Sequence, residues 1–378
     1  MNSISRYLKE QIKNALTPGK AIVILGARRV GKTHLIKQIV EETGKRAVYF
    51  DGEDWNVRDA FSEPRLEQLR AITSGYDLLC IDEAQQIPNI GKVVKVMVDN
   101  IEGLSVILSG SSALSLAGET GEPLTGRKVT FQMYPVSQYE LSKEENPITL
   151  KANLEERLLY GSYPEVLQTT SVDKKKRYLK ELVTDYLLKD ILELENIRNS
   201  DKLRKMLRML AFQVGQIVST EELGKAVGLN RLTVDRYLDL LAKGFVLFRV
   251  DGFSKNLRKE ITKSSKWFFY DTGIRNALNN SFQPIDIRPD KGSLWENFII
   301  AERLKWMGKS QDPANFYFWR TYDRQEIDWI EEREGQLLAL EMKWKQNKRN
   351  KGPGAWEKHY PDAEFQFVTP NNFREWVL

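Results

Sequence analysis

Short apolar runs alternate with amphipathic stretches along the first third of the chain. Four of these runs have the length and the branched side chains of buried strands. They lie within AIVILG (21–26), RAVYFDGED (46–54), YDLLCIDEAQQI (76–87) and LSVILSGSSAL (104–114). After the first run, Leu35, Ile36, Ile39 and Val40 recur at helical spacing until Gly44 ends the pattern. This alternation predicts an α/β domain with a parallel sheet over residues 1–150.

Helical spacing dominates the middle of the chain. Residues 154–199 are amphipathic, with Leu182, Tyr186 and Ile191 on one face, and we interpret this stretch as a lid or connector. Its KKKR sequence at 174–177 is more typical of a solvated helix start than of a binding site.

Three further helical patterns and two strand-like runs follow in the order of a winged helix. The helical patterns lie at 202–215, 219–228 and 230–245, and the strand-like runs at 245–253 and 266–274. Ser219 and Glu222 form a capping box, and Asn230 can cap the third helix. Three helices followed by a wing are typical of a nucleic-acid-binding module.

The last hundred residues combine one helix with a strand, a turn and a strand. SLWENFIIAERLKWMG (293–308) predicts the helix, and residues 315–346 predict the strands. Asp328 and Glu341 are thirteen residues apart, which fits a β-hairpin.

Composition fits an organisation in several domains. The 378 residues are 41% hydrophobic and 29% charged, as in soluble globular proteins, and this length suggests two or three domains. We place the domains at 1–150, 151–281 and 282–378.

Nothing in the sequence points to export or to a membrane. Cys80 is the only cysteine, so an intrachain disulfide is excluded and a reducing compartment is consistent. The first sixteen residues lack the apolar core of a signal peptide, and no run of about 18 apolar residues occurs. We expect a cytoplasmic protein that does not enter the membrane.

The sequence GARRVGKTH (26–34) has the spacing of a phosphate-binding loop. Its glycines let backbone N–H groups converge on a phosphate in front of a helix N-terminus. Lys32 supplies an ammonium group and Thr33 a hydroxyl for Mg²⁺. The expected nucleotide-binding residues are Gly26, Ala27, Arg28, Arg29, Val30, Gly31, Lys32, Thr33 and His34, with Ser109 as a candidate γ-phosphate sensor. For Ser109, an ordinary serine-rich loop or helix cap is an equally open alternative.

Two carboxylates end the third strand. Asp82 can reach the Mg²⁺ shell held by Thr33, and Glu83 can activate the water that attacks the γ-phosphate. For the pair alone, the alternative is a cap on the following turn.

A cation is needed where charge develops on the phosphate. Arg127 follows a glycine-rich loop and is a candidate for this role, with Arg28 and Arg29 as rivals.

The motifs GARRVGKT, LLCIDEAQQIP, ILSGSSAL, LTGRKVTFQMYPVSQYEL and LYGSYPEVL occur in this order. The ordered series resembles a widespread prokaryotic AAA-type P-loop ATPase family whose C-terminal domain was described as unknown in function. The resemblance runs from about Ile4 to the C-terminus. It implies ATP as the nucleotide, hydrolysed with Mg²⁺.

A second polar constellation lies in the C-terminal segment. Glu341 and Lys343 alternate onto one face of a strand next to Asp328, and Glu296 on the preceding helix can complete a Mg²⁺ shell. The pattern is similar to the PD-(D/E)xK nuclease core, a restriction-endonuclease-like fold that the resembled family carries. Catalysis would then use Glu341 and Lys343. The alternative is a salt-bridged hairpin of a decayed nuclease fold.

Positive charge is concentrated in the winged-helix segment. Residues 198–266 contain fifteen Lys or Arg and seven Asp or Glu, a net charge of +8 against +5 for the whole chain. The candidates for phosphate contact are Arg231, Thr233, Arg236, Lys255, Arg258, Lys259 and Lys263. Contact with duplex DNA and docking on an acidic ATPase surface are equally open.

The sequence thus predicts an ATPase whose nucleotide state rearranges a winged helix and a nuclease-like domain, with duplex DNA as a candidate partner. The alternative is a nucleotide-dependent regulator or scaffold for protein partners with an inactive nuclease-like domain. No feature of the sequence reports an oligomeric state.

Overall fold

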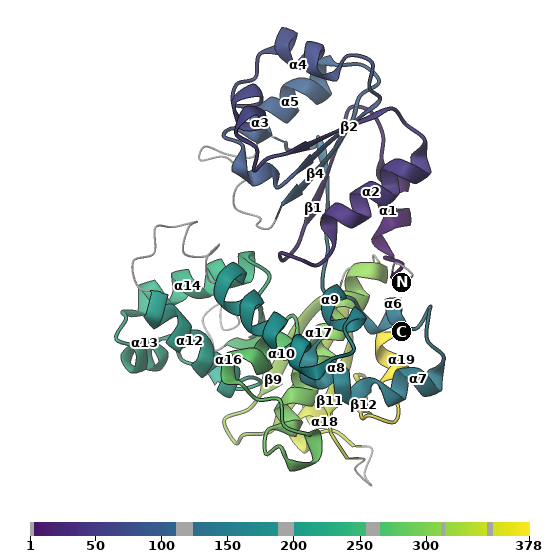
Figure 1. The fold of residues 1–378 in the computed structure, drawn as a ribbon. Helices are drawn as coiled ribbons and strands as arrows, with labels where there is room; N and C mark the ends of the chain where they lie inside the picture. Colours follow the sequence, from purple (N-terminus) through teal and green to yellow (C-terminus); the bar gives the residue numbers. More distant parts are fainter. Residues whose placement is uncertain (1–3, 111–123, 188–199, 255–264, 311–313, 346–350) are drawn as a thin grey trace. The chain divides into compact units, whose positions relative to one another are not determined.

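The computed structural model describes residues 4–110, 124–187, 200–254, 265–310, 314–345 and 351–378 (Figure 1). The chain divides into two units. The N-terminal unit contains Asn2–Pro135 and Lys243–Phe245, and the C-terminal unit contains Val136–Ala242 and Val246–Leu378.

A five-stranded parallel sheet forms the core of the N-terminal unit, which confirms the predicted α/β fold. The strand order is β2-β3-β4-β1-β5, and every neighbouring pair is parallel. The strands are β1 (Ala21–Leu25), β2 (Ala47–Asp51), β3 (Leu78–Asp82), β4 (Ser105–Gly110) and β5 (Lys128–Gln132). The inner strands β1, β3 and β4 are buried along their whole length, as expected for a parallel sheet covered on both faces.

Helices cover the two faces of this sheet. They are α1 (Leu8–Ala15), α2 (Lys32–Thr43), α3 (Trp55–Ala60), α4 (Leu66–Thr73), the 3₁₀ helix η1 (Ala84–Gln86) and α5 (Ile90–Asn100). Figure 1 shows α3, α4 and α5 on one side of the strands and α1 and α2 on the other. The predicted apolar face of α2 is buried at Leu35, Ile36 and Ile39.

The carboxyl ends of these parallel strands meet at one edge. The register places Leu25 beside Gly110 and Asp51 beside Asp82. The loops that follow β1, β3 and β4 therefore leave the sheet at the same edge, which is where open α/β sheets bind their ligands.

The C-terminal unit contains helices from both predicted C-terminal segments. They are α6 (Gln138–Leu141), α7 (Pro147–Ala152), α8 (Leu154–Tyr160), α9 (Pro164–Gln168), α10 (Val172–Glu181), η2 (Leu182–Leu187), α12 (Ser200–Phe212), α13 (Thr220–Val227), α14 (Arg231–Lys243), α16 (Thr272–Asn279), η3 (Ile285–Ile287), α17 (Lys291–Ser310), α18 (Gly354–His359) and α19 (Arg374–Val377). The helices α12, α13 and α14 cover the three patterns predicted for the winged helix. Asn230 caps α14, since its side chain accepts a hydrogen bond of 2.8 Å from the Thr233 amide.

One seven-stranded sheet runs through the C-terminal unit in the order β12-β11-β10-β9-β7-β8-β6. Its strands are β6 (Ile217–Val218), β7 (Leu247–Gly252), β8 (Ser265–Phe269), β9 (Asn315–Arg320), β10 (Glu326–Arg333), β11 (Gln336–Met342) and β12 (Glu364–Val368). The two halves join where β7 pairs in parallel with β9, with Asp251 beside Tyr317. Strands from both sides of the boundary placed at 281/282 thus share one sheet, and that boundary stays a prediction.

A buried carboxylate explains the LYGSYPEVL motif. Asp271 caps α16 through its bond to the Ile274 amide and also accepts a bond of 2.7 Å from the Ser162 amide. Gly161 has a φ of 74°, and a Cβ there would lie 2.0 Å from an Asp271 carboxylate oxygen. Only glycine fits at this position, so the motif positions α16 against the end of α8.

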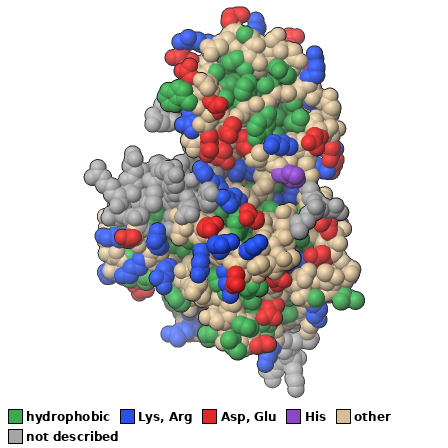
Figure 2. Space-filling model, viewed as in Figure 1, with side chains coloured by type: hydrophobic (Ala, Val, Ile, Leu, Met, Phe, Trp, Pro, Cys, Tyr) green, Lys and Arg blue, Asp and Glu red, His purple; other side chains and the backbone are tan. Residues whose placement is uncertain are grey.

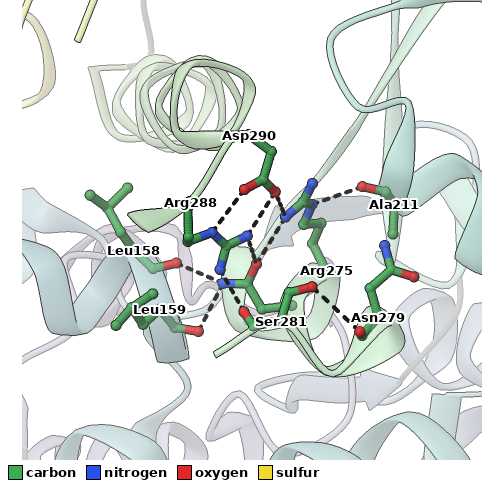
Figure 3. A network of polar contacts seen from close by, with 9 residues as sticks. Leu158, Leu159, Ala211, Arg275, Asn279, Ser281, Arg288 and Asp290 are labelled. Atoms are coloured by element: carbon green, nitrogen blue, oxygen red, sulfur yellow. Dashed lines mark hydrogen bonds and ion pairs between the residues drawn. The ribbon is translucent and has the colours of Figure 1, made fainter. Parts of the chain in front are cut away.

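A second buried network ties helices α8, α12 and α16 to the segment that precedes α17 (Figure 3). The guanidinium of Arg275 donates to the Ala211 carbonyl at 2.8 Å and to Asp290 at 2.5 Å. The Asn276 amide donates to two carbonyl oxygens at the end of α8, and Arg288 donates to Asp290 at 2.8 Å. Asp290 is the carboxylate that neutralises both arginines.

We expect Asp290→Asn to lower the stability of the C-terminal unit by about 2–3 kcal/mol, because two buried guanidinium groups lose their counter-charge. Urea unfolding of the full-length protein measures the change. Tryptophan fluorescence reports mainly on this unit, which holds eight of the nine tryptophans. The control is Asp286→Asn, an exposed residue of η3 nearby, with an expected change within about 0.5 kcal/mol.

The same carboxylate gives a pH dependence. Burial alone would raise the pKa of Asp290, but Arg288 and Arg275 lower it to about 2. A carboxyl with a lowered folded pKa stabilises the fold above its ordinary pKa. This contribution, about 1–2 kcal/mol for a side chain that is 30% exposed, should be lost as the pH falls from about 4 to 2. If the stability of Asp290→Asn falls between about pH 4 and 2 as much as that of the wild-type protein, the assignment is contradicted.

Candidate functional site

The phosphate loop joins β1 to α2 in the expected strand, loop and helix order. Gly31 has a φ of 100° directly before Lys32, the first residue of α2. A Cβ on Gly26 would lie 2.1 Å from the Met133 carbonyl oxygen. The first position therefore needs glycine for space and the second for its backbone conformation.

The Lys32 side chain folds back over this loop. It is buried, and its Nζ donates to the carbonyl oxygens of Gly26 at 3.0 Å and Ala27 at 3.1 Å. An ammonium group held by two backbone carbonyls is positioned to exchange one of them for a phosphate oxygen.

Asp82 at the end of β3 is the centre of the polar network. Its carboxylate accepts hydrogen bonds from the hydroxyl groups of three side chains, each on a different element. They are Thr33 on α2 at 2.5 Å, Tyr49 on β2 at 2.6 Å, and Ser109 on β4. The predicted pair Thr33 and Asp82 and the predicted sensor Ser109 thus lie together.

The network keeps this carboxylate ionised. Burial alone would raise the pKa of Asp82, but the bonds from Ser109 and its other hydroxyl partners outweigh burial and lower the pKa. Burial and the Asp82 carboxylate raise the pKa of Tyr49, which stays a neutral donor. No motif of the sequence points to Tyr49; the signal available was its place on the strand that follows the loop helix.

Glu83 leaves the strand in a left-handed conformation, with a φ of 45°. A Cβ on Gly52 would lie 2.5 Å from the Glu83 carbonyl oxygen, so Gly52 lets β2 approach this turn. The Gln85 side-chain amide donates to the Glu83 carboxylate. Glu83 is therefore next to the Asp82 network with its carboxylate held by a neutral donor.

The structure does not bring Arg127 to the phosphate loop of its own chain. Arg127 precedes β5, and its carbonyl oxygen accepts a bond of 2.8 Å from the amide of Ala21, at the start of β1. This is the edge of the sheet opposite to the loop. The guanidinium pairs there with Asp99 at 2.5 Å.

The remaining loop residues have different surroundings. Arg28 lies 3.8 Å from Glu53 in a weak ion pair, Arg29 has a φ of 61°, and His34 is exposed. Val30 is buried.

A buried lysine lies among the carboxylates of the predicted nuclease-like site. Lys266 on β8 is 1% exposed, and its Nζ is 3.1 Å from Glu296 and 3.9 Å from Asp328. It also forms an ion pair with Glu326. Burial alone would lower the pKa of Lys266, but these carboxylates raise it, so the side chain is an ammonium. Lys266 and Glu326 are not among the site residues predicted from the sequence.

The two other predicted residues form a pair of their own. Glu341 and Lys343 on β11 and its end are joined at 2.6 Å, and Asp328 is held by the Met342 amide at 2.9 Å. Burial and the nearby Asp328 raise the pKa of Glu341.

These contacts correct the expected Mg²⁺ shell of Glu296, Asp328 and Glu341. Within the described residues, no three Asp, Glu, His or Cys side chains are arranged to hold a metal ion. The cation next to Glu296 and Asp328 is the ammonium of Lys266. The residues present therefore do not fit the metal that the nuclease-like pattern implies.

The predicted nucleic-acid contacts on α14 are partly neutralised. Arg231 is exposed and lies 3.5 Å from Asp235. Thr233 uses its amide in the helix cap, and Arg236 is exposed. Lys255, Arg258, Lys259 and Lys263 lie outside the described residues.

Residues 18–142 match the AAA domain. Together with the parallel sheet and the phosphate loop, this match supports a P-loop ATPase fold for the N-terminal unit. The C-terminal unit matches two domains of unknown function, DUF8612 over residues 151–284 and DUF4143 over residues 291–372.

Relatives occur in bacteria and archaea. An uncharacterized protein of Mycobacterium tuberculosis is 26% identical over 88% of this chain and 72% of its own length. Uncharacterized proteins of Haemophilus influenzae and Methanocaldococcus jannaschii are 25% and 24% identical, over 85% and 96% of this chain and 81% and 84% of their own lengths.

Two solved structures resemble the chain weakly. The Thermotoga maritima RuvB Holliday junction branch migration motor is 19% identical with a TM-score of 0.31, covering 64% of this chain and 85% of that chain. The Aeropyrum pernix ORC1 protein in complex with DNA is 14% identical with a TM-score of 0.34, covering 72% and 91%. Separately, none of the described helices is both long and apolar enough to span a bilayer.

We expect Lys266→Met to destabilise the C-terminal unit by about 3 kcal/mol or more, because buried carboxylates lose their counter-charge. Urea unfolding followed by tryptophan fluorescence measures the loss. Lys345→Met removes an exposed lysine from the same unit and serves as the control, with a change within about 0.5 kcal/mol.

A Mn²⁺ titration tests the same assignment. With Asp82→Asn present to weaken the nucleotide site, Mn²⁺ should not stabilise the C-terminal unit while Lys266 is in place. Stabilisation by Mn²⁺ would mean that a metal displaces the ammonium and would refute this account of the cluster.

Proposed function

We propose that this protein binds ATP together with Mg²⁺ in its N-terminal unit and hydrolyses it. The observation that carries the proposal is the convergence of Lys32, Thr33 and Asp82 where the phosphate loop leaves the sheet. The match of residues 18–142 to the AAA domain supports it. The preference for ATP follows from the family resemblance.

The loop supplies the phosphate contacts. Backbone N–H groups between Gly26 and Lys32 and the N-terminus of α2 favour negative charge at this point. Lys32 adds an ammonium group, which two carbonyl oxygens of the loop hold near the phosphate position. The Ser109 hydroxyl donates a hydrogen bond to Asp82 and lies at the same edge of the sheet.

The donor set suits Mg²⁺. Thr33 and Asp82 offer one hydroxyl and one ionised carboxylate, and Mg²⁺ in nucleotide sites commonly takes its other ligands from phosphate and water. These two residues would hold the ion, which neutralises phosphate charge when bound.

Glu83 would act as the general base. Its carboxylate is adjacent to the Asp82 network but is not part of the hydroxyl cluster, so it stays available to accept a proton from water. Gln85 orients it by a single side-chain bond.

Hydrolysis would switch the arrangement of the C-terminal unit. One specific observation favours the alternative in which this unit binds partners without cutting nucleic acid. The ammonium of Lys266 lies next to Glu296 and Asp328, two of the three carboxylates expected to hold a nuclease metal. We therefore assign ATP turnover as the activity of this protein. In this proposal the C-terminal unit binds partners and does not cleave nucleic acid.

Two substitutions separate binding from turnover. We expect Lys32→Ala to abolish nucleotide binding, because the phosphates lose their cation, as measured by isothermal titration with a non-hydrolysable ATP analogue. Glu83→Gln should bind the analogue normally but lower phosphate release by about 10²–10⁴-fold, the contribution of a general base.

Arg127→Ala serves as the matched control. Because Arg127 lies at the opposite sheet edge, its loss should leave turnover by the isolated chain unchanged. Wild-type turnover in Glu83→Gln would remove the base assignment. A complete loss in Arg127→Ala would show that this arginine reaches a phosphate after all.

A further inference from the structure

Two helices of the C-terminal unit expose basic side chains that have no acidic partner among the described residues. On α10, Lys174, Arg177 and Lys180 are exposed, and Lys176 is partly exposed. On α12, the exposed ones are Arg204, Lys205 and Arg208. None of these seven forms an ion pair with any residue in the described part of the chain.

The same helices bury their other faces. Lys175 on α10 is 4% exposed and pairs with Glu156, and Tyr178 and Leu179 are buried. Both α10 and α12 pack on α16, which the Asp271 cap and the Arg275 network hold in place. The exposed cations therefore lie on helices that are packed against the rest of the unit, and not on a loop.

The contrast with α13 and α14 is clear in the ion pairs. There Lys225 pairs with Glu221 at 2.7 Å and Arg231 lies 3.5 Å from Asp235. The exposed residues of α14 also include Asp239, so its surface carries both signs of charge. On α10 and α12 the exposed acidic residues are Asp173, Glu181 and Asp201, all at the helix ends.

Figure 2 shows Lys and Arg side chains gathered over the helical part of the C-terminal unit that carries α10 and α12. Several exposed cations on one helix are the groups that neutralise a phosphate backbone. A protein partner would instead need an apolar centre within the patch. The exposed apolar side chains Val172 and Phe212 stand at the ends of the two helices.

We propose that the exposed basic side chains of α10 and α12 form a surface that binds the phosphate backbone of duplex DNA. This assignment replaces two expectations from the sequence: the KKKR stretch at 174–177 is part of a binding surface, and α14 is not the main contact. Binding here is independent of sequence, because phosphates carry no base information. It does not depend on ATP hydrolysis.

The test is fluorescence anisotropy with the full-length protein and a labelled duplex of about 30 base pairs, without nucleotide, from about 50 to 200 mM salt. The test variant is Arg177→Gln with Arg208→Gln. The matched control is Arg231→Gln with Arg236→Gln, which removes the same charge from α14. All four residues are exposed, and thermal unfolding checks that both variants are folded.

We expect the α10/α12 variant to bind at least about tenfold more weakly at low salt. The slope of log affinity against log salt should fall in magnitude by about 2, one for each phosphate that the variant no longer neutralises. The α14 control should change affinity less than about twofold, and Arg177→Lys with Arg208→Lys should restore binding.

Several results would overturn the proposal. They are no binding by the wild-type protein, affinity that does not change with salt, or a larger loss in the α14 control. Tighter binding of an RNA duplex under the same conditions would reject DNA as the partner. The two proposals can fail separately. DNA binding is measured without nucleotide, so a wild-type protein that does not hydrolyse ATP could still bind DNA through this surface.

Discussion

The N-terminal unit depends on the hydrogen bonds that the carboxylate of Asp82 accepts. This carboxylate accepts hydroxyl hydrogen bonds from the loop helix and from the strands on both sides of its own strand. A buried ionised group is costly unless its bonds are satisfied, and here three donors satisfy it. The fold is thus stabilised by the same atoms that would meet the metal, so stability and chemistry in this unit cannot be tuned independently.

Buried charge has a different role in the C-terminal unit. Asp271 and Lys266 each join segments that are far apart in the sequence, and Asp290 joins α16 to the segment before α17. Each of these charges is compensated by amides or opposite charges. Apolar contacts would tolerate small slips of one helix against another, whereas a charge without its partner is penalised strongly. These networks therefore fix the relative placement of helices and sheet within the unit.

The sequence could predict the parallel sheet and the Thr33, Asp82 and Ser109 site, because local motifs and strand ends carry that information. It could not predict Lys266, since that side chain reaches carboxylates 30, 60 and 62 residues away through tertiary packing alone. The position of Arg127 could not be predicted for a related reason. Its place after a loop is local, but which sheet edge it occupies depends on the parallel pairing of β5 with β1.

The pairing of β7 with β9 has a consequence for how such proteins evolve. The two regions that match separate domains of unknown function contribute neighbouring strands to one sheet. Separating them would expose two strand edges with unpaired backbone groups, which favours aggregation. The shared sheet therefore favours keeping residues 151–372 together when parts of this protein are exchanged or deleted.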